Sequence, residues 1–112
     1  MHDSNCIFCK IITGQIPSKI ILETQFSIVI QDIAPQAPIH YLILPKKHIK
    51  DLASCADADR DIVADMMLVP SFLAQGFDQE LAFKLVTNNG YAAGQRVFHL
   101  HFHFMAGKNF DV

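Results

Sequence analysis

The chain has 112 residues, 51% of them hydrophobic and 18% charged, and its formal net charge at pH 7 is −2. This length and composition exclude a disordered chain and a pair of independent domains, so we expect one domain over residues 1–112. No basic stripe is present, which argues against a nucleic-acid partner. No apolar run approaches the roughly 20 residues that span a bilayer, and the first residues lack the pattern of a signal peptide, so we expect no membrane partner.

The use of cysteine favours a reducing compartment. The three cysteines, Cys6, Cys9 and Cys55, are odd in number and too few for a disulfide framework. We therefore expect a cytoplasmic protein.

The first 45 residues predict one short helix followed by three strands. Residues 5–13 carry an apolar helical face, with Asn5 as the capping residue and Gly14 closing the helix. Runs of β-branched and aromatic residues predict three strands, over residues 19–23, 26–31 and 39–44. The first two strands form a hairpin, and the prolines of residues 34–38 require a loop before the third.

The rest of the chain predicts one long helix and two further strands. Apolar residues recur at helical spacing over residues 54–76, where Pro70 should kink the helix or start a new segment. Strands are expected over residues 81–88 and 97–105, with a loop at 89–94. Short connections between strands favour an α+β fold with a largely antiparallel, five-stranded sheet.

Three histidines alternate with apolar residues in the last predicted strand. Because alternate side chains of a strand point to opposite faces, His99, His101 and His103 share one face. The core face belongs to four apolar residues, Phe98, Leu100, Phe102 and Phe104. A row of three imidazoles gains little from burial, so it indicates a functional site.

Two chemistries fit such a row. One is a metal site built from three imidazoles, as in a zinc hydrolase. The other is phosphoryl-type catalysis, in which one imidazole is the nucleophile and its neighbours orient it and bind phosphate oxygens. The flanking residues favour phosphate: Gly94, Gln95 and Arg96 offer close backbone approach and donors, and Asp32 suits a ribose diol.

The segment from His99 to Phe104 matches the His-φ-His-φ-His-φ-φ motif, φ being apolar, of the histidine triad (HIT) superfamily. The resemblance extends over residues 5 to 108 and is closest to the Hint branch, the purine nucleoside phosphoramidases. Five further blocks resemble that branch, at residues 7–12, 16–21, 31–38, 45–49 and 88–90. The resemblance implies the HIT-like fold and a homodimer whose sheet continues across the two subunits.

The resemblance also implies a role for each matching residue. His101 would be the nucleophile that forms a nucleotidyl-histidine, His103 would contact the phosphate, and His99 and His40 would support them. An apolar slot for the purine would be formed by Ile7, Phe8, Ile11, Ile16, Ile30 and Ile33. Asp32 would bind the ribose hydroxyls. The phosphate and leaving group would be surrounded by Asn88, Gly94, Gln95 and Arg96.

A structural zinc ion is a further expectation. Cys6 and Cys9 form a C-x2-C pair, which needs two more ligands to hold zinc. Some microbial relatives bind zinc through such a pair and two histidines, which correspond to His48 and His99. Two ordinary half-buried cysteines are the alternative. No cofactor is expected to be required for catalysis.

Together with these observations, the resemblance implies an enzyme that releases AMP or a similar nucleoside monophosphate from purine nucleoside phosphoramidates or acyl-adenylates. The alternatives are a nucleotide-binding regulatory module with negligible turnover and a zinc hydrolase that uses the three histidines together. Arg96 stands where several HIT relatives carry a small hydroxyl residue, so we expect it to affect the choice of leaving group.

Overall fold

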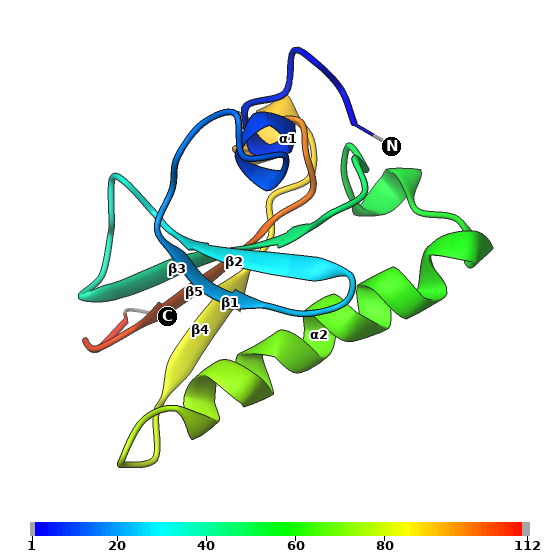
Figure 1. Cartoon of the computed structure of the whole chain (residues 1–112). Coiled ribbons are helices and arrows are strands. Elements are labelled where there is room, and N and C mark those ends of the chain that lie inside the picture. Colours follow the sequence, from blue (N-terminus) through cyan, green and yellow to red (C-terminus); the bar gives the residue numbers. More distant parts are fainter. Residues whose placement is uncertain (1, 111–112) are drawn as a thin grey trace.

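The computed structural model describes residues 2–110, so the two ends of the range 1–112 lie outside it. Its strands form one antiparallel sheet in the order β1-β2-β3-β5-β4 (Figure 1). The strands are β1 (Ile20–Glu23), β2 (Ser27–Gln31), β3 (Ile39–Pro45), β4 (Phe83–Val86) and β5 (Phe102–Ala106). The predicted α+β fold with a five-stranded antiparallel sheet is confirmed.

Two helices, α1 (Ile7–Ile12) and α2 (Arg60–Gln75), pack on opposite sides of the sheet (Figure 1). Because successive side chains of a strand point to opposite faces, the same strands supply the core under α2 and the core under α1. On β2, Val29 packs in the core that contains α2, whereas Ile28 and Ile30 pack with Phe8 of α1. On β5, Phe102 and Phe104 pack on the α2 side, so the residue between them, His103, points toward the α1 side.

The first helix is shorter than predicted and has a different cap. Cys6, not Asn5, is the N-cap, and its Sγ accepts a hydrogen bond from the Cys9 backbone N–H at 3.4 Å. Asn5 instead donates its backbone N–H to Asp3 Oδ1 at 2.8 Å. The cap therefore belongs to the C-x2-C pair itself.

The long helical region is divided at its start rather than at Pro70. Residues Leu52–Ser54 and Asp57–Asp59 form two 3₁₀ turns, and α2 begins only at Arg60. The Asp59 carboxylate, which accepts the Ala56 N–H at 2.9 Å, holds the second turn. The helix continues through Pro70, so no new segment starts there, and the Pro70 side chain is buried. Its core contacts offset the hydrogen bond that proline cannot donate.

The last strand begins five residues later than predicted, at Phe102, and residues 97–99 form a bend. Pro45, at the end of the adjacent β3, has no N–H to continue the ladder. Its carbonyl is instead bonded by the His99 ring, with 2.8 Å between His99 Nε2 and Pro45 O. Phe98, predicted to lie in the core, is consequently 42% exposed.

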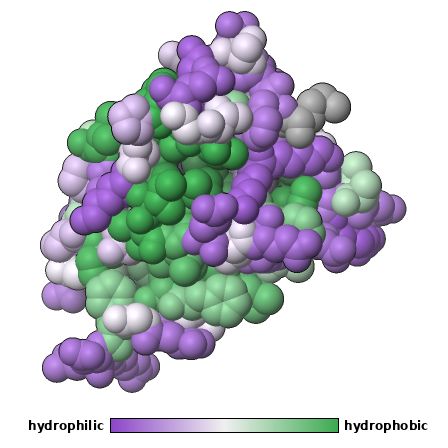
Figure 2. All heavy atoms as spheres, viewed as in Figure 1, coloured by the Kyte–Doolittle hydropathy of each residue, from purple (hydrophilic) through white to green (hydrophobic). Residues whose placement is uncertain are grey.

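The fourth strand is also shorter than the predicted range 81–88 and lies at the edge of the sheet. Figure 2 shows hydrophobic surface gathered over the strands below α1, with hydrophilic residues around it. Within the described residues, no helix combines the length and the apolar character needed to cross a membrane.

Candidate functional site

A cavity of about 430 Å³ lies between α1 and the α1-facing side of the sheet. Most of its lining is aliphatic or aromatic, and its polar groups include Asp32, His101 and His103. A mostly apolar cavity with a few converging polar groups is typical of a small-molecule site.

Ten of the residues predicted to bind or act on a nucleotide line this cavity. They are Ile7, Phe8, Ile11, Ile16, Ile30, Asp32, Ile33, Arg96, His101 and His103. Ile33 lies at its rim, because its side chain is 98% exposed. The other members come from α1, from the segment after it, from β2 and β5 or the residues directly next to these strands, and, for Arg96, from the loop before β5, which explains why residues far apart in sequence share one cavity.

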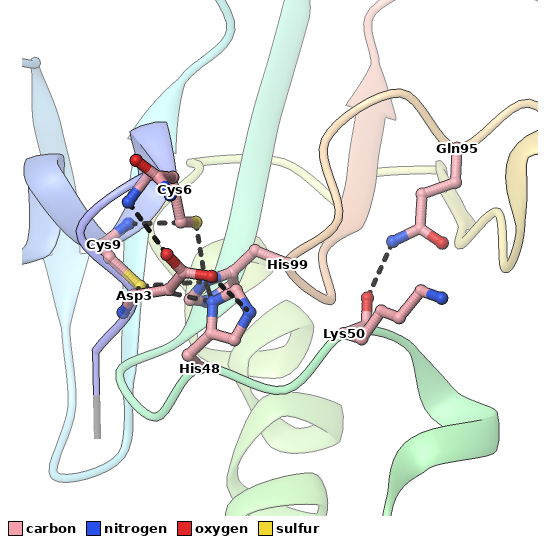
Figure 3. A network of polar contacts seen from close by, with 8 residues as sticks. Asp3, Cys6, Cys9, His48, Lys50, Gln95 and His99 are labelled. Atoms are coloured by element: carbon pink, nitrogen blue, oxygen red, sulfur yellow. Dashed lines mark hydrogen bonds and ion pairs between the residues drawn. The ribbon is translucent and has the colours of Figure 1, made fainter.

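Three predicted phosphate-side residues lie away from the cavity lining, in the loop that precedes Arg96. The Gln95 amide is engaged at both ends. Its Nε2 donates to the Lys50 carbonyl at 2.8 Å (Figure 3). The same Nε2 donates to the Val97 carbonyl, and Oε1 accepts the Gly90 N–H at 2.8 Å. Gly94 has a φ of +102°, and a side chain there would contact Asn88. These residues therefore shape the loop that carries Arg96.

Five lining residues were not identified from the sequence: Pro17, Ser18, Gln31, Leu42 and Val97. A signal was available for Leu42. It lies two residues after His40 on β3 and pairs with Ile30, a residue already assigned to the slot. The loop residues carry no comparable periodic pattern.

The His101 ring is fixed by a backbone carbonyl. Its Nδ1 donates to the His99 carbonyl at 2.7 Å, so in the neutral ring the lone pair is on Nε2. The Phe8 ring packs edge-on against it, with 5.2 Å between ring centroids. Burial lowers the pKa of His101 below the usual 6.5. The ring is therefore a neutral, oriented imidazole at neutral pH.

His103 belongs to a hydrogen-bonded chain that begins at a backbone amide. The Gln36 N–H can only donate, so His40 Nδ1 accepts it, at 3.0 Å, and the His40 proton lies on Nε2. This Nε2–H lies 2.9 Å from His103 Nδ1 and 3.3 Å from Asp32 Oδ2. His103 Nδ1 is then an acceptor, which leaves the remaining proton of His103 on Nε2. Burial and the neighbouring His101 and His40 lower the pKa of His103 to about 4.

His99 points away from these two histidines, into a cluster with Cys6, Cys9 and His48 (Figure 3). The cysteines come from the start of α1, His48 follows β3, and His99 precedes β5. His99 is fully buried, and burial lowers its pKa to about 4. The structure thus brings together all four residues predicted to hold a metal, and it separates His99 from the cavity.

The four ligand atoms of this cluster have the spacing of a tetrahedral zinc site. His99 Nδ1 lies 3.4 Å from Cys6 Sγ, 3.6 Å from Cys9 Sγ and 3.2 Å from His48 Nδ1, and Cys9 Sγ lies 3.3 Å from His48 Nδ1. Zinc with ordinary bond lengths separates two nitrogens by about 3.3 Å, and sulfur from nitrogen by about 3.5 Å. The single lone pair of His99 Nδ1 cannot accept hydrogen bonds from all three of these neighbours. The residues present therefore fit a metal ion.

The surroundings of the cluster support the same assignment. His99 Nε2–H donates to the Pro45 carbonyl, which leaves its Nδ1 lone pair facing the cluster. Each sulfur has a backbone N–H beside it: the Cys9 N lies 3.4 Å from Cys6 Sγ, and the Asp3 N lies 3.4 Å from Cys9 Sγ. Burial raises the pKa of the Cys6 thiol because it disfavours the charged thiolate. A bound cation would offset this effect.

The geometry does not favour a metal site shared by the three histidines of the row. Among the described residues, the groups able to hold a metal are the cysteine cluster and Asp32 with His40 and His103, and His101 is in neither. The carbonyl of His99, not its ring, is what reaches His101.

Comparisons with known proteins identify the family of the chain. The family model for "Scavenger mRNA decapping enzyme C-term binding" matches residues 5–110. The chain is 40% identical over 101 residues to Protein HitA of Neisseria gonorrhoeae, covering 90% of this chain and 94% of HitA. It is 38% identical over 105 residues to an uncharacterized HIT-like protein of Synechocystis, covering 94% and 92% of the two chains.

Solved structures give the same result. A histidine triad protein from Clostridium difficile superposes with a TM-score of 0.91 at 40% identity, covering 100% of this chain and 98% of that one. A HIT family hydrolase from Clostridium thermocellum has a TM-score of 0.91 at 39% identity, with 98% and 96% covered. The chain belongs to the histidine triad (HIT) family, of the hydrolase and nucleotide-binding class, as the histidine motif predicted.

Proposed function

We propose that this protein is a Hint-like hydrolase that releases AMP, or another purine nucleoside monophosphate, from nucleoside phosphoramidates or acyl-adenylates. The observation that carries the proposal is the hydrogen bond from His101 Nδ1 to the His99 carbonyl. It leaves Nε2 as the nucleophilic nitrogen of a neutral ring that lines the cavity.

The reaction takes place in two balanced steps. His101 Nε2 attacks the α-phosphorus, a nitrogen–phosphorus bond forms, and the bond to the leaving group breaks. A leaving amine takes up one proton, whereas a leaving carboxylate needs none. Water then attacks the same phosphorus, the bond to His101 breaks, and the nucleoside monophosphate departs. The water gives up a proton, which replaces the proton taken up by a leaving amine, or passes to solvent when a carboxylate has left.

The surrounding residues bind the nucleotide and stabilise the charge that develops. The aliphatic residues of the cavity suit a purine, and the Asp32 carboxylate at its edge suits the ribose hydroxyls. His103, with its proton on Nε2, is an N–H donor for a phosphate oxygen. His40 acts through His103 and is a positioning residue.

Zinc in the cysteine cluster has a structural role in this proposal. Bound there, it would neutralise the two thiolates and fix His99, whose carbonyl orients His101. Cys6, Cys9 and Cys55 form no disulfide, which is compatible with the proposed cytoplasmic location.

The proposal includes a homodimer with a continuous sheet. The edge strand β4 has one unpaired side within the described residues, and exposed apolar side chains lie on it and on α2: Phe83, Met67, Leu68 and Phe72. Sedimentation should give twice the monomer mass. A monomer at micromolar concentration would rule this part out.

Steady-state release of AMP from adenosine 5′-phosphoramidate tests the catalytic proposal. We expect turnover by the wild-type protein and at least about a 1,000-fold lower kcat for His101→Asn, which retains a polar side chain of similar size. Nucleotide binding without turnover by the wild-type protein would favour the regulatory module. Full activity of His101→Asn would contradict the proposed nucleophile.

A further inference from the structure

A second cavity, of about 290 Å³, adjoins the nucleotide cavity. The two share three lining residues, Ile7, Arg96 and Val97. The rest of the second cavity is formed by Asp3, Asn5, Cys6, His48 and Phe98. Because His101 and Asp32 line the first cavity and not the second, a nucleotide held there has the second cavity open beside it.

Arg96, in the wall between the two cavities, is held in a fixed orientation. Its guanidinium carbon lies 3.9 Å from the centroid of the Tyr91 ring. Its Nη1 donates to the Tyr91 carbonyl at 2.8 Å and to the Gln95 carbonyl at 3.1 Å. A guanidinium that is stacked and bonded in this way loses little further conformational entropy when it binds a ligand.

The other edge of the guanidinium is available. Within residues 2–110, Arg96 Nε and Nη2 donate no hydrogen bond, and Arg96 forms no ion pair. Nε–H and Nη2–H lie side by side, and this two-donor edge matches the two oxygens of a carboxylate. The other arginine, Arg60, instead pairs with Asp57 at 3.0 Å.

The acidic residue of the second cavity already has partners of its own. Asp3 Oδ1 accepts the Asn5 N–H at 2.8 Å, and Oδ2 lies 4.0 Å from His48 Nε2. Of the three residues that the cavities share, only Arg96 is charged, and its charge is positive.

We propose that Arg96 and the second cavity form a subsite for a carboxylate on the leaving group. This deepens the proposed function and rests on it: the favoured substrates are nucleoside phosphoramidates whose leaving amine carries a carboxylate, such as an amino acid linked through its nitrogen. Arg96 is a specificity residue in this scheme. Attack by His101 and the products are unchanged, with the amino acid leaving as the amine.

Two matched substrates test the subsite: adenosine 5′-phosphoramidates linked through nitrogen to glycine and to glycinamide. They differ only in a carboxylate against a neutral carboxamide. We expect the wild-type protein to favour the glycine compound about tenfold in kcat/KM, and Arg96→Gln to reduce this ratio to within about twofold. Arg96→Lys, which keeps the charge but loses the two-donor edge, should give an intermediate ratio.

The matched control is Arg60→Gln, which removes the same charge outside the site and should leave the ratio unchanged. Thermal unfolding checks that each variant is folded. A wild-type ratio near one, or a ratio that survives in Arg96→Gln, would overturn the subsite. Dissociation constants for both compounds separate this result from failure of the proposed function: preferential binding of the glycine compound without turnover supports the subsite and contradicts the hydrolase. Binding of neither compound contradicts both.

Discussion

His99 and His103 lie four residues apart in the same motif, yet their surroundings are of two different kinds. His99 lies in a closed cluster where four ligand atoms converge, and its ring has no access to the cavity. His103 lines the open cavity and receives a hydrogen bond from His40. Burial lowers the pKa of both rings to about 4. The residues supplied by α1 and β3, rather than the motif itself, decide which ring can hold a metal and which can meet a phosphate.

The largest effect should come from removing the closed cluster. We expect the double variant Cys6→Ser/Cys9→Ser to lose its zinc and to lower the free energy of unfolding by at least about 3 kcal/mol, because a structural metal binds only the folded state. Elemental analysis and urea unfolding measure the two changes. Cys55→Ser is the matched control, since Cys55 lies outside the cluster.

Because His99 and His103 lie in different surroundings, loss of activity and loss of zinc should be separable. His101→Asn should lose activity while it keeps its zinc. Wild-type protein without zinc after growth in zinc-supplemented medium, or a double variant that retains it, would contradict the assignment of the cluster.

A smaller effect should come from breaking the hydrogen-bonded chain of the open side. His40→Phe removes the donor to His103, and we expect kcat/KM to fall about 30-fold, or about 2 kcal/mol. His40→Gln, whose amide can donate to His103, should restore most of the rate. Zinc content should equal that of the wild-type protein in both variants. Equal losses in the two variants would show that the hydrogen bond is not what matters.

The smallest effect concerns pH. Because the pKa of His103 is about 4 in the folded protein and about 6.5 when unfolded, the folded state binds fewer protons between these values. The stability that depends on a neutral His103 is complete above pH 6.5 and is lost as the pH falls toward 4. After allowance for the half-exposed ring, we expect about 1 kcal/mol more loss over this range than in His103→Asn. Urea unfolding at several pH values measures it, and curves that run parallel would contradict it.

The sequence predicted the sheet and both helices because their signals are local. Runs of β-branched and aromatic residues identified β2 and β3, and helical periodicity identified α2. The start of β5 could not be predicted in this way, because the ladder ends where Pro45 of another strand lacks an N–H. The bend that results turns the His99 ring into the cysteine cluster.

The same limit applies to the candidate site. The residue types of the cluster and of the nucleotide slot were identifiable from motifs, whereas the orientation of side chains was not. Gln95 was expected to hold phosphate. Its amide is instead hydrogen-bonded to the backbone of Gly90, Lys50 and Val97. Arg96 and Val97, which follow Gln95 in the loop, line both cavities, and Arg96 is the charged one of the two.

The covalent intermediate on His101 tests the central claim most directly. Intact-protein mass spectrometry after rapid acid-free quenching of a single turnover with adenosine 5′-phosphoramidate should show a mass increase of one adenylyl group. Peptide mapping should place it on His101, and His101→Asn should lack it. Burst-phase release of the amine without any adduct, or an adduct on another histidine, would contradict the account.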